Sequence, residues 1–177
     1  ESAAKRLLEL VPQLDLADRT FTLQNLQGND RKTTGSYYTP PALVSALLDT
    51  ALDPVIAAAA PVGADPMAAE LALLDLKVCD PACGSGGFLV ASARRVARRL
   101  ADVRAGENQA TRQEFTTALK DVIGHCVYGV DLNATAVEFA EITLWLDTMA
   151  EGLQAPWFGL RLRRGNSLVG ASRSFYT

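Results

Sequence analysis

A glycine-rich turn is the feature of the sequence with the clearest chemical meaning. It joins an apolar, strand-like run, Leu73–Cys79, to a helix-like run that begins at Phe88. Glycines at such a turn permit positive φ and let a ligand approach the backbone without a Cβ in the way. An acid, Asp80, stands at the end of the strand. The turn therefore predicts a nucleotide-type binding site, with the candidate residues Asp80, Ala82, Gly84, Gly86 and Phe88.

The residues of the turn distinguish between two kinds of ligand. A dinucleotide fingerprint that contains Gly84 and Gly86 would have a third glycine at position 89, where this chain has Leu89. Asp80 would repel a pyrophosphate, whereas its charge suits the amino group of an amino acid. The sequence therefore favours S-adenosylmethionine over NAD. The alternative is a structural strand–turn–helix connection that binds nothing.

The elements that position this turn follow from the apolar patterning. Strands separated by helices predict a parallel sheet with right-handed crossovers, and therefore an α/β fold. The expected strands are Leu74–Cys79, Cys126–Val130 and Leu160–Arg164. The expected helices are Ser2–Val11, Pro40–Leu52, Pro66–Leu71, Phe88–Val103, Thr111–Val122 and Ala134–Ala150, with a loop at Gln24–Ser36 and a looser region at Asp53–Pro66.

The second and third strands also lead into polar residues. Asp131 follows the second strand, where a carboxylate offers two acceptor oxygens to a ribose diol. It lies 51 positions after Asp80 instead of the roughly 20 of a simple unit, so the crossover is enlarged by a helix. The alternative role for Asp131 is a helix N-cap before Ala134. Asn166 and Ser167 follow the third strand as further candidate contacts, with a plain turn as the alternative.

The run Asp80–Phe88 resembles the cofactor motif of DNA adenine-N6 methyltransferases, the kind found in type I and type IIG restriction–modification systems. The resemblance covers roughly Gly35–Gly170, and its order of elements, with Tyr38-Thr39-Pro40 first, is that of the γ class. It implies a Rossmann-like S-adenosylmethionine-dependent core with an incomplete parallel sheet. By this resemblance residues 31–177 are the cofactor-binding half of a methyltransferase domain, and residues 1–30 are a helical lead-in.

The resemblance also assigns roles to the remaining candidates. Thr39, next to Tyr38, would bond the methionine carboxylate of the cofactor at a helix N-terminus, with an ordinary helix cap as the alternative. Leu132 belongs to the same set of cofactor contacts. The family usually has Asp at the position of Asn166, where it contacts the exocyclic amine of the cofactor's adenine. We expect the side-chain carbonyl of Asn166 to accept that hydrogen bond.

The catalytic element of the resembled family is an (Asn/Asp/Ser)-Pro-Pro-(Tyr/Phe) motif, which holds the target amine and stacks on the flipped-out base. The only Pro-Pro in this sequence is Pro40-Pro41, which is at the wrong end and is followed by Ala42. We therefore assign no catalytic residue and expect the chain alone to be inactive. The leading hypothesis is the cofactor-binding part of such an enzyme in a restriction–modification or phage-defence system. The alternatives are a non-catalytic cofactor-binding or assembly module of a defence complex and a protein or RNA N-methyltransferase.

Charge and cysteine content bear on the partners. The net charge of −3 means that double-stranded DNA would be gripped through missing regions of the parent protein, with restriction or specificity subunits as further partners. Five arginines could contact phosphates, although a solvated helix surface is the favoured interpretation: Arg94, Arg95, Arg98, Arg99 and Arg104.

Three cysteines and one histidine predict buried reduced thiols and no metal site. With no signal-like stretch and no apolar run of transmembrane length, we expect a cytoplasmic piece of a longer protein, without membrane contact.

Overall fold

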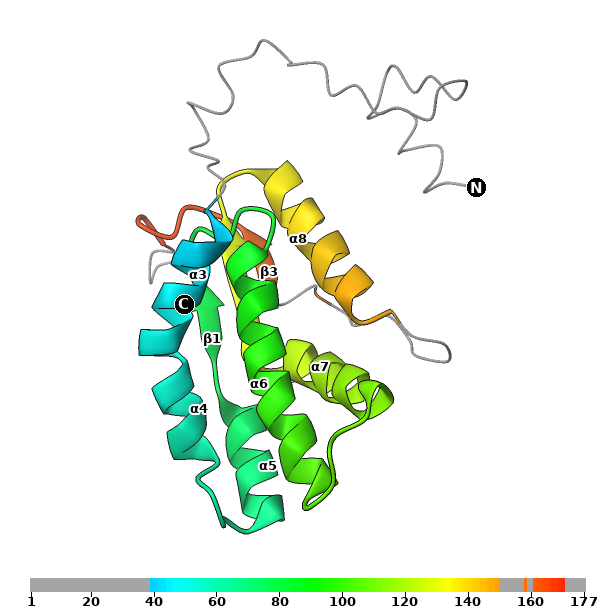
Figure 1. Cartoon of the computed structure of the whole chain (residues 1–177). Coiled ribbons are helices and arrows are strands. Elements are labelled where there is room, and N and C mark those ends of the chain that lie inside the picture. The colour runs from blue at the N-terminus through cyan, green and yellow to red at the C-terminus, as the bar shows by residue number, and fades with distance from the viewer. Residues whose placement is uncertain (1–38, 150–157, 159–160, 171–177) are drawn as a thin grey trace, which may run out of the picture. The chain divides into compact units, whose positions relative to one another are not determined.

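The structure is a computed structural model that describes residues 39–149, 158 and 161–170. Over that part of the chain Figure 1 shows helices packed on a small sheet. The helices are α3 (Pro41–Ala51), α4 (Asp53–Ala59), α5 (Pro66–Asp75), α6 (Gly87–Ala105), α7 (Arg112–Cys126) and α8 (Ala134–Asp147), and the strands are β1 (Val78–Asp80), β2 (Val127–Asp131) and β3 (Leu162–Arg164). The predicted helix Ser2–Val11 and loop Gln24–Ser36 lie outside the described residues, and the division at residue 30 stays a prediction.

The three strands form one parallel sheet in the order β1-β2-β3. Asp80 pairs with Gly129 across the first pair of strands, and Asp131 pairs with Arg164 across the second. Because the strands are parallel, their carboxyl ends lie along one edge of the sheet, which is where ligands bind in doubly wound folds. This arrangement confirms the predicted α/β class and an incomplete Rossmann-like sheet.

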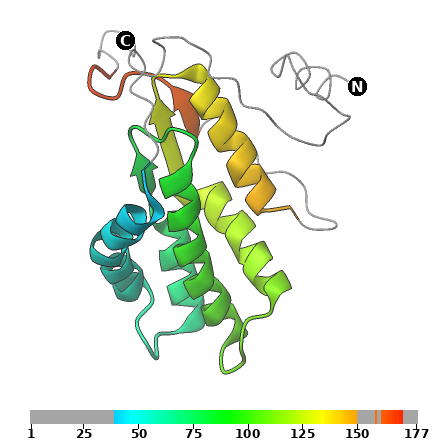
Figure 2. The same cartoon turned by 45° about the horizontal axis from the view of Figure 1, so that its top comes forward.

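Helices cover one face of this sheet, and the core lies between the two layers. In the view of Figure 2, α6 (green) runs in front of the strands and α8 (yellow to orange) runs beside β3, with α3 and α4 (cyan) on the other side of α6. Along β2 the buried residues alternate with less buried ones, as expected when one face is better covered than the other. The largest fully buried side chains include Leu73, Leu89, Leu100, Leu119, Ile123 and Leu144.

Local sequence patterns explain where two of these helices begin. At the start of α5 the side chain of Asp65 accepts a hydrogen bond from the Ala68 N–H at 2.9 Å. At the start of α7 Thr111 and Glu114 form a reciprocal capping box, which satisfies two backbone donors. The start of α7 therefore agrees with the predicted helix at Thr111, although α7 continues to Cys126 and leads directly into β2.

Two predictions for the part of the chain before β1 are wrong. The predicted first strand, Leu74–Cys79, begins too early, because residues 74 and 75 belong to α5 and β1 begins at Val78. A short apolar run cannot be assigned to helix or strand by periodicity alone, and tertiary packing decides it here. The region Asp53–Pro66, predicted to be loose, contains α4. Its Pro54 lies in the first helical turn, where the missing N–H costs nothing, and Ile56 anchors the helix in the core.

The segment formed by α3 and α4 corrects the expectation that the chain has no apolar run of transmembrane length. Pro41–Ala59 is long and apolar enough to cross a membrane by length and composition alone, which contradicts that expectation. A single helix of this kind is weak evidence for a span. The segment changes helix at Leu52, and its Asp49 and Asp53 form ion pairs with Arg95 of α6. Val44, Leu48 and Ile56 of the segment are buried in the core, and this packing accounts for part of its apolar character.

Candidate functional site

The glycine turn between β1 and α6 depends on two residues with positive φ. Gly84 has φ 52° and Gly86 has φ 87°, and side chains other than hydrogen are strained at both values. The Gly86 N–H donates to the Cys83 carbonyl at 2.8 Å and closes the turn. A Cβ on Gly86 would lie 3.2 Å from both Cα and Cβ of Ala140, so the turn packs directly on α8. Glycine is therefore needed at Gly84 for conformation and at Gly86 for conformation and close approach.

Asp131 joins the end of β2 to this turn. Its Oδ2 accepts a hydrogen bond from the Gly84 N–H at 2.9 Å, and its Oδ1 accepts one from the Asn133 N–H at 2.8 Å. The residue is only 9% exposed. The N-cap of α8 is Asn133, whose side chain accepts from the Thr135 N–H at 3.1 Å, so the alternative role of Asp131 as that cap is wrong. Each carboxylate oxygen of Asp131 keeps a further lone pair for a ligand.

Asp80 lies at the same edge, at the end of β1. Its Oδ1 accepts from the Ala82 N–H at 3.0 Å, which holds the first residues of the turn. Within the described part of the chain Oδ2 has no hydrogen-bond partner. Asp80 and Phe88 also line a cavity of about 390 Å³, whose other walls come from α3, α4 and the rest of β1. A carboxylate oxygen without a partner beside a cavity is suited to a cationic ligand group.

The loop after β3 is tied to both neighbouring loops. The Ser167 hydroxyl donates to the Pro81 carbonyl at 2.8 Å, which links residues 86 positions apart. The Gly165 N–H donates to the Asp131 backbone carbonyl at 2.9 Å. These two bonds bring the predicted residues after β3 beside the glycine turn and the end of β2.

The amide of Asn166 is oriented by its own loop. Its Oδ1 accepts hydrogen bonds from the N–H groups of Leu168 and Val169, at 3.0 and 3.2 Å. The carbonyl that we expected to accept from the cofactor's adenine amine is therefore already engaged twice. The side chain is exposed, and its Nδ2 has no partner among the residues that the structure describes.

Thr39 stands at the other side of the turn. It lines a cavity of about 200 Å³ together with residues of α3 and with Gly87, the first residue of α6. Its alternative role as the cap of α3 is wrong, because the N-cap is Pro40 and no side chain bonds the helix start. Pro40 precedes Pro41 and is held extended, with ψ 140°. Leu132 is 48% exposed directly after Asp131, and Tyr38 lies outside the described residues.

The three cysteine thiols differ in burial: Cys83 and Cys126 are buried and Cys79 is exposed. Burial, together with the nearby carboxylates of Asp80 and Asp131, raises the pKa of Cys83 to about 11, so this thiol in the turn stays protonated. Burial likewise raises the pKa of Cys126 to about 11. The predicted burial of Cys79 is wrong. Cys79 pairs in register with the half-buried Tyr128, on the less covered face of the sheet, and is exposed.

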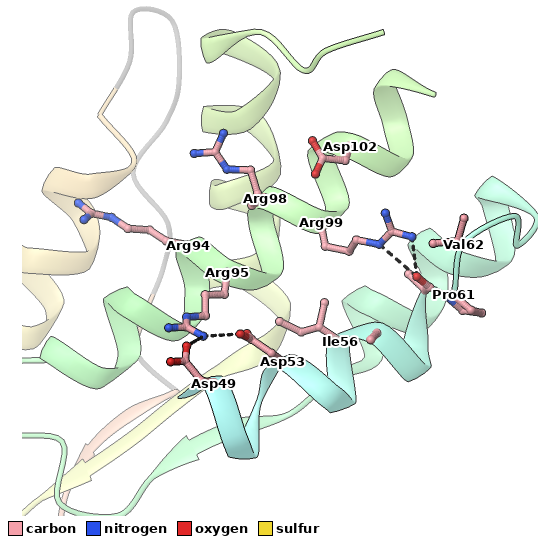
Figure 3. A pocket seen from close by; sticks show the side chains of 12 residues that line it. Asp49, Asp53, Ile56, Pro61, Val62, Arg94, Arg95, Arg98, Arg99 and Asp102 are labelled. Carbon is pink, nitrogen blue, oxygen red and sulfur yellow. Dashed lines mark hydrogen bonds and ion pairs between the residues drawn. The ribbon is translucent and has the colours of Figure 1, made fainter. Parts of the chain in front are cut away.

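The arginines of α6 are used within the fold. Arg94, Arg95, Arg98 and Arg99 border a shallow cavity of about 680 Å³, shown in Figure 3. Arg95 lies against Asp49 and Asp53, at 2.7 and 2.5 Å, and Arg99 donates twice to the Ala60 carbonyl, at 2.6 and 3.1 Å. These contacts attach α6 to α3 and α4.

The other three arginines attach α6 to further helices. Arg104 bridges Glu70 of α5 and Asp121 of α7, at 2.6 and 2.8 Å. Arg94 forms a bidentate ion pair with Asp147 of α8. The guanidinium of Arg98 lies 4.8 Å from the ring centroid of Phe115 in α7. The favoured interpretation, a solvated helix surface, did not include these links, because the spacing of arginines in the sequence does not show whether a guanidinium is exposed to solvent or paired.

Sequence reasoning also missed Gly129, the central residue of β2. A Cβ there would lie 2.8 Å from side-chain carbons of Leu162 and Leu89 and 3.0 Å from the sulfur of Cys83. This glycine therefore lets α6 and β3 approach β2 behind the glycine turn. A glycine inside a predicted strand is the pattern that could have indicated it.

Residues 67–155, about half of the chain, match the family model described as the MmeI DNA-methyltransferase domain. The chain belongs to this MmeI-type DNA-methyltransferase family. The matched residues include the glycine turn and Asp131, and they reach from α5 beyond α8. Membership of the MmeI-type family confirms the predicted resemblance to restriction–modification methyltransferases.

Two relatives agree with the MmeI-type assignment. The chain is 32% identical over 130 residues to the adenine-specific methyltransferase PglX of Streptomyces coelicolor, a match that covers 72% of this chain. It is 30% identical over 108 residues to a putative type II restriction enzyme and methyltransferase of Methanocaldococcus jannaschii, which covers 54% of this chain. The chain spans only 9% of the length of each relative.

Proposed function

We propose that the chain is the S-adenosylmethionine-binding part of a DNA adenine-N6 methyltransferase of a restriction–modification or phage-defence system. The observation that carries the proposal is the hydrogen-bonded junction at the carboxyl edge of the sheet. There Asp131 accepts from Gly84, and Ser167 donates to Pro81, so three loops from distant parts of the sequence form one surface. Membership of the MmeI-type family supports DNA methylation as the activity of the parent protein.

The donors and acceptors of this surface suit the parts of S-adenosylmethionine. Asp80 offers the amino group of the methionine part its second carboxylate oxygen, which has no partner among the described residues. Asp131 offers its remaining lone pairs to the ribose hydroxyls, as acids at the end of the second strand do in related folds. Thr39 offers a hydroxyl beside the first turn of α6, whose N-cap makes no side-chain hydrogen bond, so that the helix N-terminus favours the methionine carboxylate.

In this proposal the residues of the chain bind and orient the cofactor, which supplies an electrophilic methyl group. The target adenine would be held by a Pro-Pro-aromatic element that the printed sequence does not contain. The α6 arginines already pair within the fold, so we assign the main DNA contacts to other parts of the parent protein, in the cytoplasm. An assay of methyl transfer by the parent protein to adenine in duplex DNA would distinguish the two candidate functions, an enzyme and a non-catalytic assembly module.

Calorimetry with the chain tests the cofactor part of this proposal. We expect S-adenosylhomocysteine to bind with 1:1 stoichiometry. Asp80→Asn keeps an oxygen for the Ala82 N–H but removes the charge, so it should weaken this binding by about tenfold, the loss expected for one charge-assisted hydrogen bond. Adenosine has no amino-acid part, and its affinity should not change.

A matched control is Asp75→Asn, which removes the same charge near the other end of β1, from a side chain that is 90% exposed. It should bind both ligands as the unmodified chain does. The proposal is wrong if the folded chain binds neither ligand. It is also wrong if Asp80→Asn and Asp75→Asn bind S-adenosylhomocysteine equally well.

A further inference from the structure

We infer that Asn166 presents a hydrogen-bond donor to the base of the cofactor, and that it contacts a ring nitrogen of the adenine and not the exocyclic amine. The inference rests on the proposed function, because it concerns the adenine side of the same site. It reverses the polarity that we expected from the resemblance, in which an acidic residue at this position accepts from the amine.

The polarity follows from the hydrogen bonds that fix the amide. Two backbone N–H groups, from Leu168 and Val169, converge on the Oδ1 of Asn166. A rotation of the amide by 180° would put its own NH₂ against both donors and break both bonds. The orientation is therefore set by the loop, and the part of the side chain left for a ligand is the NH₂, which can only donate.

The position of Asn166 relative to the rest of the site is fixed on both sides. Gly165 bonds the backbone of Asp131, the proposed ribose acceptor, and Ser167 bonds Pro81 in the glycine turn. Asn166 stands between these two tethers and is exposed. An exposed donor beside the ribose acceptor lies within reach of the base of a bound nucleoside.

The chemistry of adenine makes the two polarities distinguishable. Its exocyclic amine donates hydrogen bonds, whereas its ring nitrogens accept them. An acid at this position would therefore pair with the amine, and an amide NH₂ pairs with a ring nitrogen. Asn166→Asp is a nearly isosteric test, because one carboxylate oxygen can keep both backbone bonds while the other replaces the donor with an acceptor.

The experiment compares S-adenosylhomocysteine with its purine analogue, in which hydrogen replaces the exocyclic amine. The ratio of their two dissociation constants is measured by calorimetry for the chain and for Asn166→Asp. Removing the amine should cost the variant at least about tenfold more affinity than it costs the unmodified chain, because only the variant has an acceptor for it. The added negative charge affects both ligands alike and cancels in the ratio.

Asn108→Asp is the matched control, since it adds the same charge at an exposed loop residue between α6 and α7. Its ratio should equal that of the unmodified chain. If both ligands bind and Asn166→Asp leaves the ratio unchanged, the inference is overturned while the proposed function stands. If the folded chain binds neither ligand, the proposed function fails and the inference fails with it.

Discussion

Replacing Asp131 with asparagine tests whether this carboxylate holds the glycine turn in place. Its two oxygens accept from two different backbone donors, Gly84 N–H at 2.9 Å and Asn133 N–H at 2.8 Å. An asparagine keeps one oxygen and puts an NH₂ group against the other donor. One charge-assisted bond is then lost and one N–H is left unsatisfied at a site that is only 9% exposed.

Hydrogen bonds to charged groups contribute about 1.5–3 kcal/mol, so we expect Asp131→Asn to lower the free energy of unfolding by about 2 kcal/mol. With a typical urea m-value of about 1–3 kcal/mol/M, the midpoint should fall by about 1 M. Urea titration followed by far-UV circular dichroism measures this shift.

Asp80→Asn is the control for this measurement. Asp80 accepts one backbone hydrogen bond, from the Ala82 N–H, through a single oxygen that asparagine retains. Its cost should stay within about 0.5 kcal/mol, the range of ordinary surface substitutions. Equal midpoints for the Asp131 and Asp80 variants would show that Asp131 does not support the turn, and would refute this reasoning.

Two further predictions concern the residues packed behind the turn. Gly129→Ala puts a Cβ 2.8 Å from neighbouring side chains and should lower the free energy of unfolding by about 1–3 kcal/mol, measured by urea titration. The control Gly124→Ala lies in an open position of α7 and should raise the free energy of unfolding by about 0.5–1 kcal/mol. Equal effects of the two substitutions would contradict the packing of β2. In iodoacetamide labelling at pH 8, read by mass spectrometry, exposed Cys79 should react first, because a pKa of about 11 instead of 9.0 cuts the thiolate fraction of Cys83 and Cys126 about a hundredfold. Early labelling of Cys83 would mean that the turn is open.

The parts of the site that could be predicted are those written in local sequence. The glycines, the acid after each of the first two strands and the polar residues after β3 follow from strand–turn–helix patterns. Parallel pairing then brings them to one edge, as Asp80 and Asp131 illustrate. The site needs no long-range information beyond the order of strands and helices.

Most of the parts that could not be predicted depend on contacts between distant residues, and one depends on the conformation of a single loop. The pairing of Arg104 with both Glu70 and Asp121 exists only once three helices are packed. The exposure of Cys79 depends on which face of the sheet the helices cover. The polarity of Asn166 depends on two backbone donors in its own loop, whose direction no residue pattern specifies. Tertiary packing settles the first two of these features, and the conformation of one loop settles the third.

The most direct test of the central claim is where S-adenosylhomocysteine binds. In a titration of the ¹⁵N-labelled chain followed by NMR, we predict saturable shifts of the backbone amides of Gly84, Gly86, Asn133 and Ser167, at the carboxyl edge of the sheet. The amides around Arg99, in the shallow cavity of about 680 Å³, should stay unchanged. Shifts confined to that cavity, or no shifts in a folded chain at millimolar ligand, would contradict the claim that this edge is a cofactor site.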